Sequence, residues 1–208
     1  LILYPSFLSF TVISPSKPGP MQFLFPLILK LPRVLVPGPM KFLLDFGDTE
    51  TPTGAAFSNP PMQMDPEKGM EANTKKWRNA EIPAANGHGT ARAIAKIYGV
   101  LANGGSRDGV HVLKPETIEM ARQTQSDGRD LGLGGIHSRF GLGFMLGTEH
   151  INMGPSEGSF GHGGAGGSLG FADPDNKVSL GFVMNQMHPG ITAWKTATDV
   201  ADLVYSNI

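Results

Sequence analysis

The residues with the clearest chemical potential lie together in one short run, F-G-H-G-G-A-G-G-S-L-G-F-A-D-P, at positions 160–174. Five of the seven positions from 161 to 167 are glycine, and His162 stands among them. Glycine has no side chain to pack and loses much conformational entropy on folding, so packing alone does not explain so many. Bare main chain lets a ligand approach closely and accept hydrogen bonds from peptide N–H groups. The run therefore predicts one wall of a ligand site.

A hairpin is predicted to position this run. Residues 169–172 and the apolar run at 178–184 flank the turn sequence D-P-D-N at 173–176. Turn residues between two apolar runs are typical of paired strands. A further strand is predicted at residues 140–147, which begin with F-G-L-G-F. His162 would then lie on a strand edge.

Three helices are predicted around these strands. Residues 90–103 carry apolar side chains at the i, i+3, i+4, i+7 spacing, and N-G-G at 103–105 ends that helix. Pro115 suits the first turn of a second helix, which carries Ile118 and Met120 with Ala121. A third helix, over residues 191–205, has an apolar stripe that closes with Tyr205. The predicted fold class is therefore α+β, an antiparallel sheet with flanking helices.

The composition limits the classes of function. The 208 residues suit one domain with a sizeable core, and a net charge of −1 gives no reason to expect nucleic acid as a partner. Cysteine is absent, which excludes disulfides and thiolate metal sites but identifies no compartment. The other histidines show no i, i+4 pairing, so no metal is expected. Residues 161–166 also satisfy G-x-G-x-x-G, but a dinucleotide site needs a helix to begin there, so no cofactor is expected.

Residues 1–58 differ from the rest and are predicted to form a proline-rich, loosely structured segment. Residues 1–13 are apolar and uncharged, but they lack the basic start of a signal peptide. Prolines interrupt any run of the roughly 20 apolar residues that a membrane span needs. The sequence predicts loop-rich chain here, lying across a core that residues 59–208 provide.

Three stretches, in the same order, resemble one family. F-G-H-x-G-x-G-G-S, its D-P-D turn and the strand G-F-V-M-N are similar to the third active-site strand and return strand of serine β-lactamase-related proteins. That family includes class C β-lactamases, penicillin-binding proteins and related esterases. A-E-I-P-A-A-N-G-H-G-T-A-R at 80–92, leading into I-Y-G-V-L-A-N-G-G, and F-G-L-G-F at 140–144 agree with it. The resemblance implies that residues 59–208 are the C-terminal part of a β-lactamase-related domain, with a partial β-lactamase/transpeptidase-like fold.

This resemblance implies hydrolysis of esters or amides through an acyl-serine intermediate, without a cofactor. The triplet His162-Gly163-Gly164 matches the family's K-T-G, with histidine in place of lysine as in the esterase-like relatives. His162 is then the predicted catalytic residue, and it donates less dependably than lysine because its ordinary pKa is about 6.5. The predicted substrate-binding residues are Gly163, Gly164, Ala165 and Ser168, with the N–H of Ala165 contributing to the oxyanion hole.

The residues that react in this family are not credibly present. S-P-S-K at 14–17 spells S-x-x-K, but two prolines follow at once and oppose the helix that would bring Ser14 and Lys17 together. Y-S-N at 205–207 spells Y-x-N, but it follows the strand motif, whereas the family places it well before. Tyr205 is better explained as an apolar contact of the last helix. The predicted nucleophile therefore lies outside this chain.

Two interpretations remain open, and a third concerns stability. The chain is either the C-terminal portion of a β-lactamase-related serine hydrolase, with a small-molecule ester, amide or peptide as substrate, or a catalytically inactive β-lactamase-like binding or assembly protein. A third interpretation is an unstable truncated product. Such a product would expose the contact face of a missing lobe, an apolar patch prone to self-association.

Overall fold

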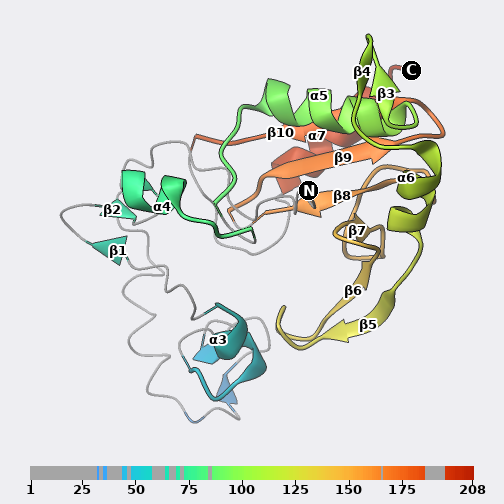
Figure 1. Ribbon diagram of the computed structural model, residues 1–208. Coiled ribbons are helices and arrows are strands. Elements are labelled where there is room, and N and C mark those ends of the chain that lie inside the picture. Colours follow the sequence, from blue (N-terminus) through green and yellow to red (C-terminus); the bar gives the residue numbers. More distant parts are fainter. Residues whose placement is uncertain are drawn as a thin grey trace. The chain divides into compact units, whose positions relative to one another are not determined.

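The computed structural model describes residues 32, 35–36, 44–45, 48–57, 64–65, 69–70, 73–83, 86–164, 166–185 and 195–208 (Figure 1). These residues belong to two compact units, which we describe separately. The first residues of the predicted C-terminal helix, the motif S-P-S-K and Ala165 all lie outside the described residues.

Among its described residues, the smaller unit includes a short helix and a pair of short strands. The helix α3 (Pro52–Phe57) begins with proline, which suits a first turn because that position needs no N–H donor. The hydroxyl of Thr53, a buried residue of this helix, donates a hydrogen bond to the Leu131 carbonyl at 2.9 Å. Strands β1 (Met64–Asp65) and β2 (Gly69–Met70) pair with each other. A short helix therefore forms within the segment that was predicted to be loosely structured.

Most of a six-stranded sheet lies in the larger unit. Its strand order is β10-β9-β8-β7-β6-β5, so neighbours in sequence are also neighbours in space (Figure 1). The four pairs from β10 to β6 are antiparallel, and the predicted hairpin is confirmed as β9 and β10. The strands are β5 (Ser126–Asp130), β6 (Ile136–Phe140), β7 (Met145–Leu146), β8 (Phe160–Gly163), β9 (Leu169–Asp173) and β10 (Val178–Phe182).

The single strand predicted at residues 140–147 is wrong, because a turn divides it into the end of β6 and the whole of β7. The Gly141 N–H donates to the Phe144 carbonyl at 2.9 Å and closes this turn. Gly143 has a φ of 81°, which glycine adopts readily. A Cβ at Gly141 would lie 2.1 Å from the Ala121 carbonyl oxygen, so no larger residue fits there. The alternation of glycine and apolar residues serves a turn here rather than a strand.

The helix α5 (Ala91–Ala102) confirms the clearest helical prediction. The Thr90 side chain accepts a hydrogen bond from the Ala93 N–H at 3.2 Å and so caps the first turn. The helix ends at Asn103, whose N–H donates to the Val100 carbonyl at 3.2 Å. Both boundaries therefore follow from polar residues in the sequence.

The helix α6 (Pro115–Arg122) begins at the predicted proline and buries Ile118 and Ala121. The helix also carries Met120, as predicted, and this side chain is 55 % exposed. The last helix is α7 (Lys195–Tyr205), within the predicted range. The remaining elements of the larger unit are α4 (Lys75–Asn79), β3 (Ser106–Arg107) and β4 (Val110–His111).

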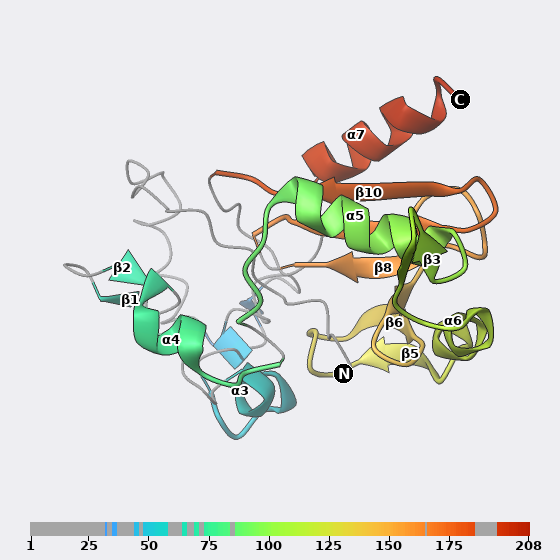
Figure 2. The same ribbon diagram turned by 45° about the horizontal axis from the view of Figure 1, so that its top comes forward.

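The helices α5 and α7 cover opposite faces of the β9–β10 hairpin (Figure 2). A Cβ at Gly170 would lie 2.5 Å from the Tyr98 ring, and one at Gly181 would lie 2.4 Å from a main-chain oxygen of α5. Glycine at these positions therefore lets α5 lie directly on the sheet. Adjacent residues of a strand point to opposite faces, and the ring of Phe171 accordingly stacks on the Tyr205 ring of α7, with centroids 6.3 Å apart.

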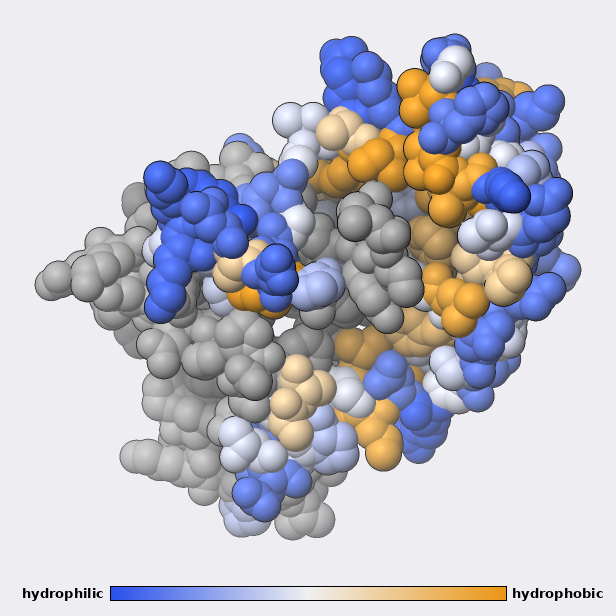
Figure 3. Space-filling view, viewed as in Figure 1, coloured by the Kyte–Doolittle hydropathy of each residue, from blue (hydrophilic) through white to orange (hydrophobic). Residues whose placement is uncertain are grey.

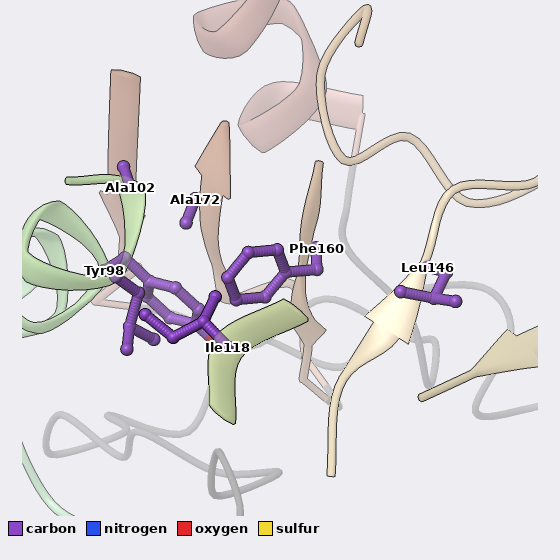
Figure 4. Close-up of a cluster of buried hydrophobic side chains, with 7 residues drawn as sticks. Tyr98, Ala102, Ile118, Leu146, Phe160 and Ala172 are labelled. Atoms are coloured by element: carbon purple, nitrogen blue, oxygen red, sulfur yellow. The ribbon is translucent and has the colours of Figure 1, made fainter. Parts of the chain in front are cut away.

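The main cluster of buried apolar side chains lies between α5, α6 and the strands (Figure 4). The rings of Phe144 and Phe160 meet edge to face, with centroids 4.9 Å apart. Burying one side chain of this size contributes about 1.5–3 kcal/mol. The cluster comprises Tyr98, Leu101, Ala102, Ile118, Leu146, Phe160 and Ala172.

The described elements confirm the predicted α+β class, an antiparallel sheet with helices on both faces. Among the helices that the structure describes, none is long and apolar enough to cross a membrane.

Candidate functional site

His162 lies on β8, on the face of the sheet that α5 covers. It is two residues from Phe160, whose ring belongs to the core cluster on that face, and alternation places both side chains on the same side. Across the ladder His162 pairs with Gly170, which in turn pairs with Gly181 on β10. The imidazole therefore stands in a row with the two glycines on which α5 lies.

Two described neighbours of His162 are an aromatic ring and a main-chain carbonyl. Its ring lies 6.2 Å from the Phe140 ring, centroid to centroid, and the side chain is half-buried. Its Nδ1 lies 2.5 Å from the carbonyl oxygen of Gly163, the next residue. Burial lowers the pKa of His162 below its ordinary value, and the contact with the Gly163 carbonyl opposes that shift only in part. The predicted catalytic residue is thus held in a largely desolvated position.

A tight turn follows His162 and joins β8 to β9. The Gly164 N–H donates to the Ser168 carbonyl at 2.8 Å, and the Gly167 N–H donates to the Gly164 carbonyl at 3.0 Å. Ser168 is buried, as are Gly163 and Gly164. The structure therefore brings four of the five predicted site residues together along one strand end and its turn.

Several of the glycines have structural reasons that the ligand interpretation did not anticipate. Gly166 and Gly167 have φ angles of 87° and 112°, which residues with a side chain rarely adopt. A Cβ at Gly161 would lie 2.5 Å from the Cβ of Phe171 on the neighbouring strand. Turn geometry and close strand packing account for these three glycines, which leaves Gly163 and Gly164 as the main-chain positions beside the imidazole.

The prediction that His162 lies on a strand edge needs refinement. The strand β8 lies inside the sheet, between β7 and β9. However, the pairing of β7 with β8 covers only Phe160 and Gly161, which face Leu146 and Met145. The ladder between β7 and β8 therefore ends one residue before His162.

Of the two tyrosines described on these helices, Tyr205 lies on the face of the sheet opposite His162, and Tyr98 lies on the same face. The Tyr205 hydroxyl donates to the Asp173 carboxylate at 2.7 Å, on the α7 face of the hairpin. Tyr98 packs over Gly170, but its hydroxyl is buried, and burial raises its pKa. The rejection of Y-S-N as a catalytic motif agrees with these contacts.

Sequence reasoning missed a buried carboxylate on the opposite face. Asp173 is 0 % exposed, and it accepts hydrogen bonds from the hydroxyls of Ser156 and Tyr205 at 2.8 and 2.7 Å. The Asn176 side chain and the N–H groups of Asp175 and Asn176 donate to it as well. Burial alone would raise the pKa of Asp173, but these donors together hold it below its ordinary value. The only sequence signal was the D-P-D-N turn.

A second missed feature is an exposed histidine between two carboxylates. The His137 Nε2 lies 2.6 Å from Asp127, and its Nδ1 lies 2.9 Å from Glu149. Hydrogen bonds to these two carboxylates raise the pKa of His137. Among the described residues, no group of three or more His, Asp or Glu side chains is arranged to hold a metal ion.

Comparison with known proteins places the chain in a family. The sequence model of the family Beta-lactamase matches residues 26–203. The esterase/beta-lactamase LipL of Mycobacterium tuberculosis is 40 % identical over 110 residues, which are 52 % of this chain and 24 % of LipL. This chain thus spans about a quarter of that relative's length.

Solved structures agree with that placement. A family VIII carboxylesterase is 36 % identical, with a TM-score of 0.62 over 65 % of this chain and 36 % of its own. A penicillin-binding protein homologue from Caulobacter crescentus is also 36 % identical, with a TM-score of 0.62 over 69 % of this chain and 38 % of its own. These similarities confirm a partial β-lactamase/transpeptidase-like fold. Because the family model covers most of its residues, this chain belongs to the beta-lactamase family.

Proposed function

We propose that this chain provides the carbonyl-binding wall of a serine hydrolase that cleaves ester or amide bonds through an acyl-serine intermediate. His162 contacts the substrate, the main chain from Gly163 to Ala165 lies against its carbonyl group with the Ala165 N–H as the donor that polarises it, and Ser168 lies along the bound ligand. The attacking serine comes from a segment outside these 208 residues. The proposed domain boundary is residue 59, with residues 59–208 forming the β-lactamase-related part.

The end of β7 before His162 is the observation that carries this proposal. If the ladder between β7 and β8 continued beyond the pair of Met145 with Gly161, it would engage the main chain beside the imidazole. The ladder ends at that pair instead. Preorganised backbone N–H groups at such an edge suit a developing oxyanion, and each one contributes roughly 10²–10³-fold to the rate in hydrolases. The esterase and β-lactamase names of the relatives support a small ester, amide or peptide as substrate.

A chimera tests this function. Residues 86–208 of this chain replace the corresponding C-terminal part of LipL, which retains its own upstream segment. We expect hydrolysis of a chromogenic ester by the chimera, and a decrease in kcat/KM of about 10²-fold for His162→Ala, since a positioned acid–base group contributes at least that much. His111→Ala is the matched control, because His111 lies exposed on β4 and should leave the rate unchanged.

The chain by itself supplies the second arm. We expect the chain alone to hydrolyse no ester, and Ser14→Ala to make no difference to that result. Turnover by the chain alone that survives Ser14→Ala and falls with His162→Ala would show that the nucleophile lies within these residues. A chimera that folds, as judged by circular dichroism, but hydrolyses no ester would favour the inactive binding protein instead.

Self-association is the second part of the proposed behaviour. Apolar side chains lie on the surface over α5 (Figure 3), and Ile97 on this helix is 47 % exposed. Val110 and Val112, at the β3–β4 hairpin, are about as exposed. We expect the sedimentation coefficient to rise with protein concentration and Ile97→Glu to weaken that rise. A monomer at all concentrations would contradict self-association.

A further inference from the structure

The imidazole of His137 lies between two carboxylates that come from different parts of the chain. Its Nε2 atom lies 2.6 Å from a carboxylate oxygen of Asp127 on β5, and its Nδ1 atom lies 2.9 and 3.1 Å from the two carboxylate oxygens of Glu149. An ionised carboxylate only accepts hydrogen bonds, so both ring nitrogens must carry a proton for both contacts to be hydrogen bonds. The arrangement therefore requires the charged imidazolium.

Glu149 belongs to a tight turn that follows β7. Thr148 and Ile151 exchange main-chain hydrogen bonds, with N···O distances of 3.0 and 3.2 Å. The Thr148 hydroxyl oxygen also accepts hydrogen bonds from the N–H groups of His150 and Ile151. These contacts hold the 148–151 turn together internally, so the turn can move as one unit.

Side chains on one face of β6 join this turn to the sheet. The described pairs between β6 and β7 end at Arg139 with Leu146, before the turn begins. Beyond that pair, the Arg139 Nη1 donates to the Gly147 carbonyl at 3.3 Å, and His137 contacts Glu149. An arginine keeps its charge at all working pH values. The contact at the base of the turn is therefore permanent, whereas the contact at its tip depends on the protons of His137.

The charged groups around the imidazole determine which contact an uncharged ring keeps. The Arg139 Nε lies 3.6 Å from the second carboxylate oxygen of Asp127, so this carboxylate has a further cationic partner on the strands. The His150 Nε2 lies 3.6 Å from Glu149, but His150 belongs to the same turn and does not join it to β6. Hydrogen bonds to Asp127 and Glu149 raise the pKa of His137, so the second proton is lost only above the ordinary value of about 6.5.

We propose that His137 is a pH-dependent clasp between β6 and the 148–151 turn: the imidazolium holds Asp127 and Glu149 together, and loss of one proton releases Glu149 with its turn. The uncharged ring keeps its proton on Nε2, where the shorter contact to Asp127 lies, and the Nδ1 lone pair then faces the Glu149 carboxylate. Two acceptors that face each other repel, so the turn moves away from the strand. The clasp is closed below pH 6.5 and opens as the pH rises through the raised pKa.

NMR on the full chain labelled with ¹⁵N measures both the proton and the motion of the turn. We expect the order parameters of the Glu149 and His150 amides to fall from about 0.85 to below about 0.6 between pH 5.5 and pH 9. The midpoint should coincide with that of the His137 imidazole, whose Nε2 should keep its proton at pH 9. Order parameters that do not change with pH, or an uncharged ring with its proton on Nδ1, would overturn the proposal.

Two variants test whether competition for one proton opens the clasp. Asp127→Asn supplies an amide N–H that can donate to Nε2, so the single proton of the uncharged ring can stay on Nδ1 and hold Glu149. We expect the turn of this variant to remain ordered at pH 9. In Glu149→Ala, the turn should be mobile at both pH values. A turn that still opens at high pH in Asp127→Asn would overturn the proposal.

His150→Gln is the matched control, because His150 carries the other imidazole beside Glu149. We expect this variant to show the same midpoint and the same change in order parameters as the unmodified chain. Disappearance of the transition would assign it to His150 and overturn the role of His137. None of these measurements depends on catalysis, so their outcome is independent of the proposed hydrolase function.

Discussion

The two faces of the β8–β9 hairpin treat ionisable groups in opposite ways. On the α7 face, Asp173 is completely buried, yet its hydrogen-bond donors keep its pKa low and the carboxylate charged. On the α5 face, His162 is only half-buried, yet burial lowers its pKa and favours the uncharged ring. Hydrogen-bond donors outweigh burial at Asp173, whereas burial outweighs the contact with the Gly163 carbonyl at His162. The charged group is held by structural hydrogen bonds, and the uncharged one is the residue that we propose to contact the substrate.

The largest expected effect comes from removing Asp173, the charged group in this comparison. Asp173→Ala leaves the hydroxyls of Ser156 and Tyr205 and the Asn176 side chain without their acceptor. Losing hydrogen bonds to a buried charge should lower the free energy of unfolding by about 2–4 kcal/mol. Urea unfolding measures this loss. Asp175→Ala is the control, because Asp175 is exposed in the same turn; equal losses in the two variants would contradict the role of the network.

The next effect tests the packing of α5 over Gly170, which lies beside His162, the uncharged group in this comparison. Gly170→Val would place a Cβ 2.5 Å from the Tyr98 ring, so α5 or that ring must shift. Overpacking of this kind typically lowers the free energy of unfolding by about 1–3 kcal/mol. Water should then reach His162, and its pKa should move back toward the ordinary value in an NMR titration. In Gly89→Ala, whose Cβ has room, neither quantity should change. A destabilised variant with an unmoved His162 pKa would show that α5 does not keep water from the ring.

A smaller effect appears in the dependence of stability on pH. Because the folded pKa of His162 is below its unfolded value of about 6.5, the unfolded chain binds more protons in the window between the two values. The stability contributed by the uncharged ring is complete above pH 6.5 and decreases as the pH falls through that window. His162→Asn should remove this part of the slope between pH 7.5 and 5.5 in urea titrations. An unchanged slope would contradict a desolvated imidazole.

The smallest effect sharpens the comparison with an exposed histidine. His137 lies between Asp127 and Glu149, so its pKa is raised and its stabilising charge is present below pH 6.5 and lost as the pH rises through the raised value. The pKa of Glu149 is lowered. The stability that the ion pair contributes is therefore lost on the acid side only as the pH falls through this lowered value. His137→Gln should therefore matter only between those two limits, opposite in direction to His162→Asn. Stability differences that grow at high pH would contradict the sign.

Local polar residues made much of the fold predictable. The cap at Thr90, the proline that begins α6 and the D-P-D-N turn each act within a few residues, so their elements follow from neighbouring sequence. The strand predicted at 140–147 failed because the clash that forces Gly141 comes from Ala121, which lies far along the chain. Long-range packing of that kind leaves no local pattern.

The candidate site, like the fold, was predictable where neighbouring residues determine the structure and not where residues distant in the sequence meet. The sequence identified His162 through its glycine-rich surroundings, and the structure places it at the point where β7 stops pairing. The five donors to Asp173 come from three separate segments, and the carboxylates around His137 come from two. No spacing rule connects such residues, so sequence reasoning identified neither the buried network around Asp173 nor the carboxylates around His137.

The link between Tyr205 and Asp173 joins residues 32 positions apart. The β9–β10 hairpin precedes α7 in the sequence, so its strands can pair before the helix docks on them. Until then the carboxylate lacks the phenol hydroxyl that completes its shell, and the Phe171 ring lacks its stacking partner. Docking of α7 is therefore the step that completes the hydrogen bonds of Asp173 and covers the Phe171 ring on this side of the hairpin.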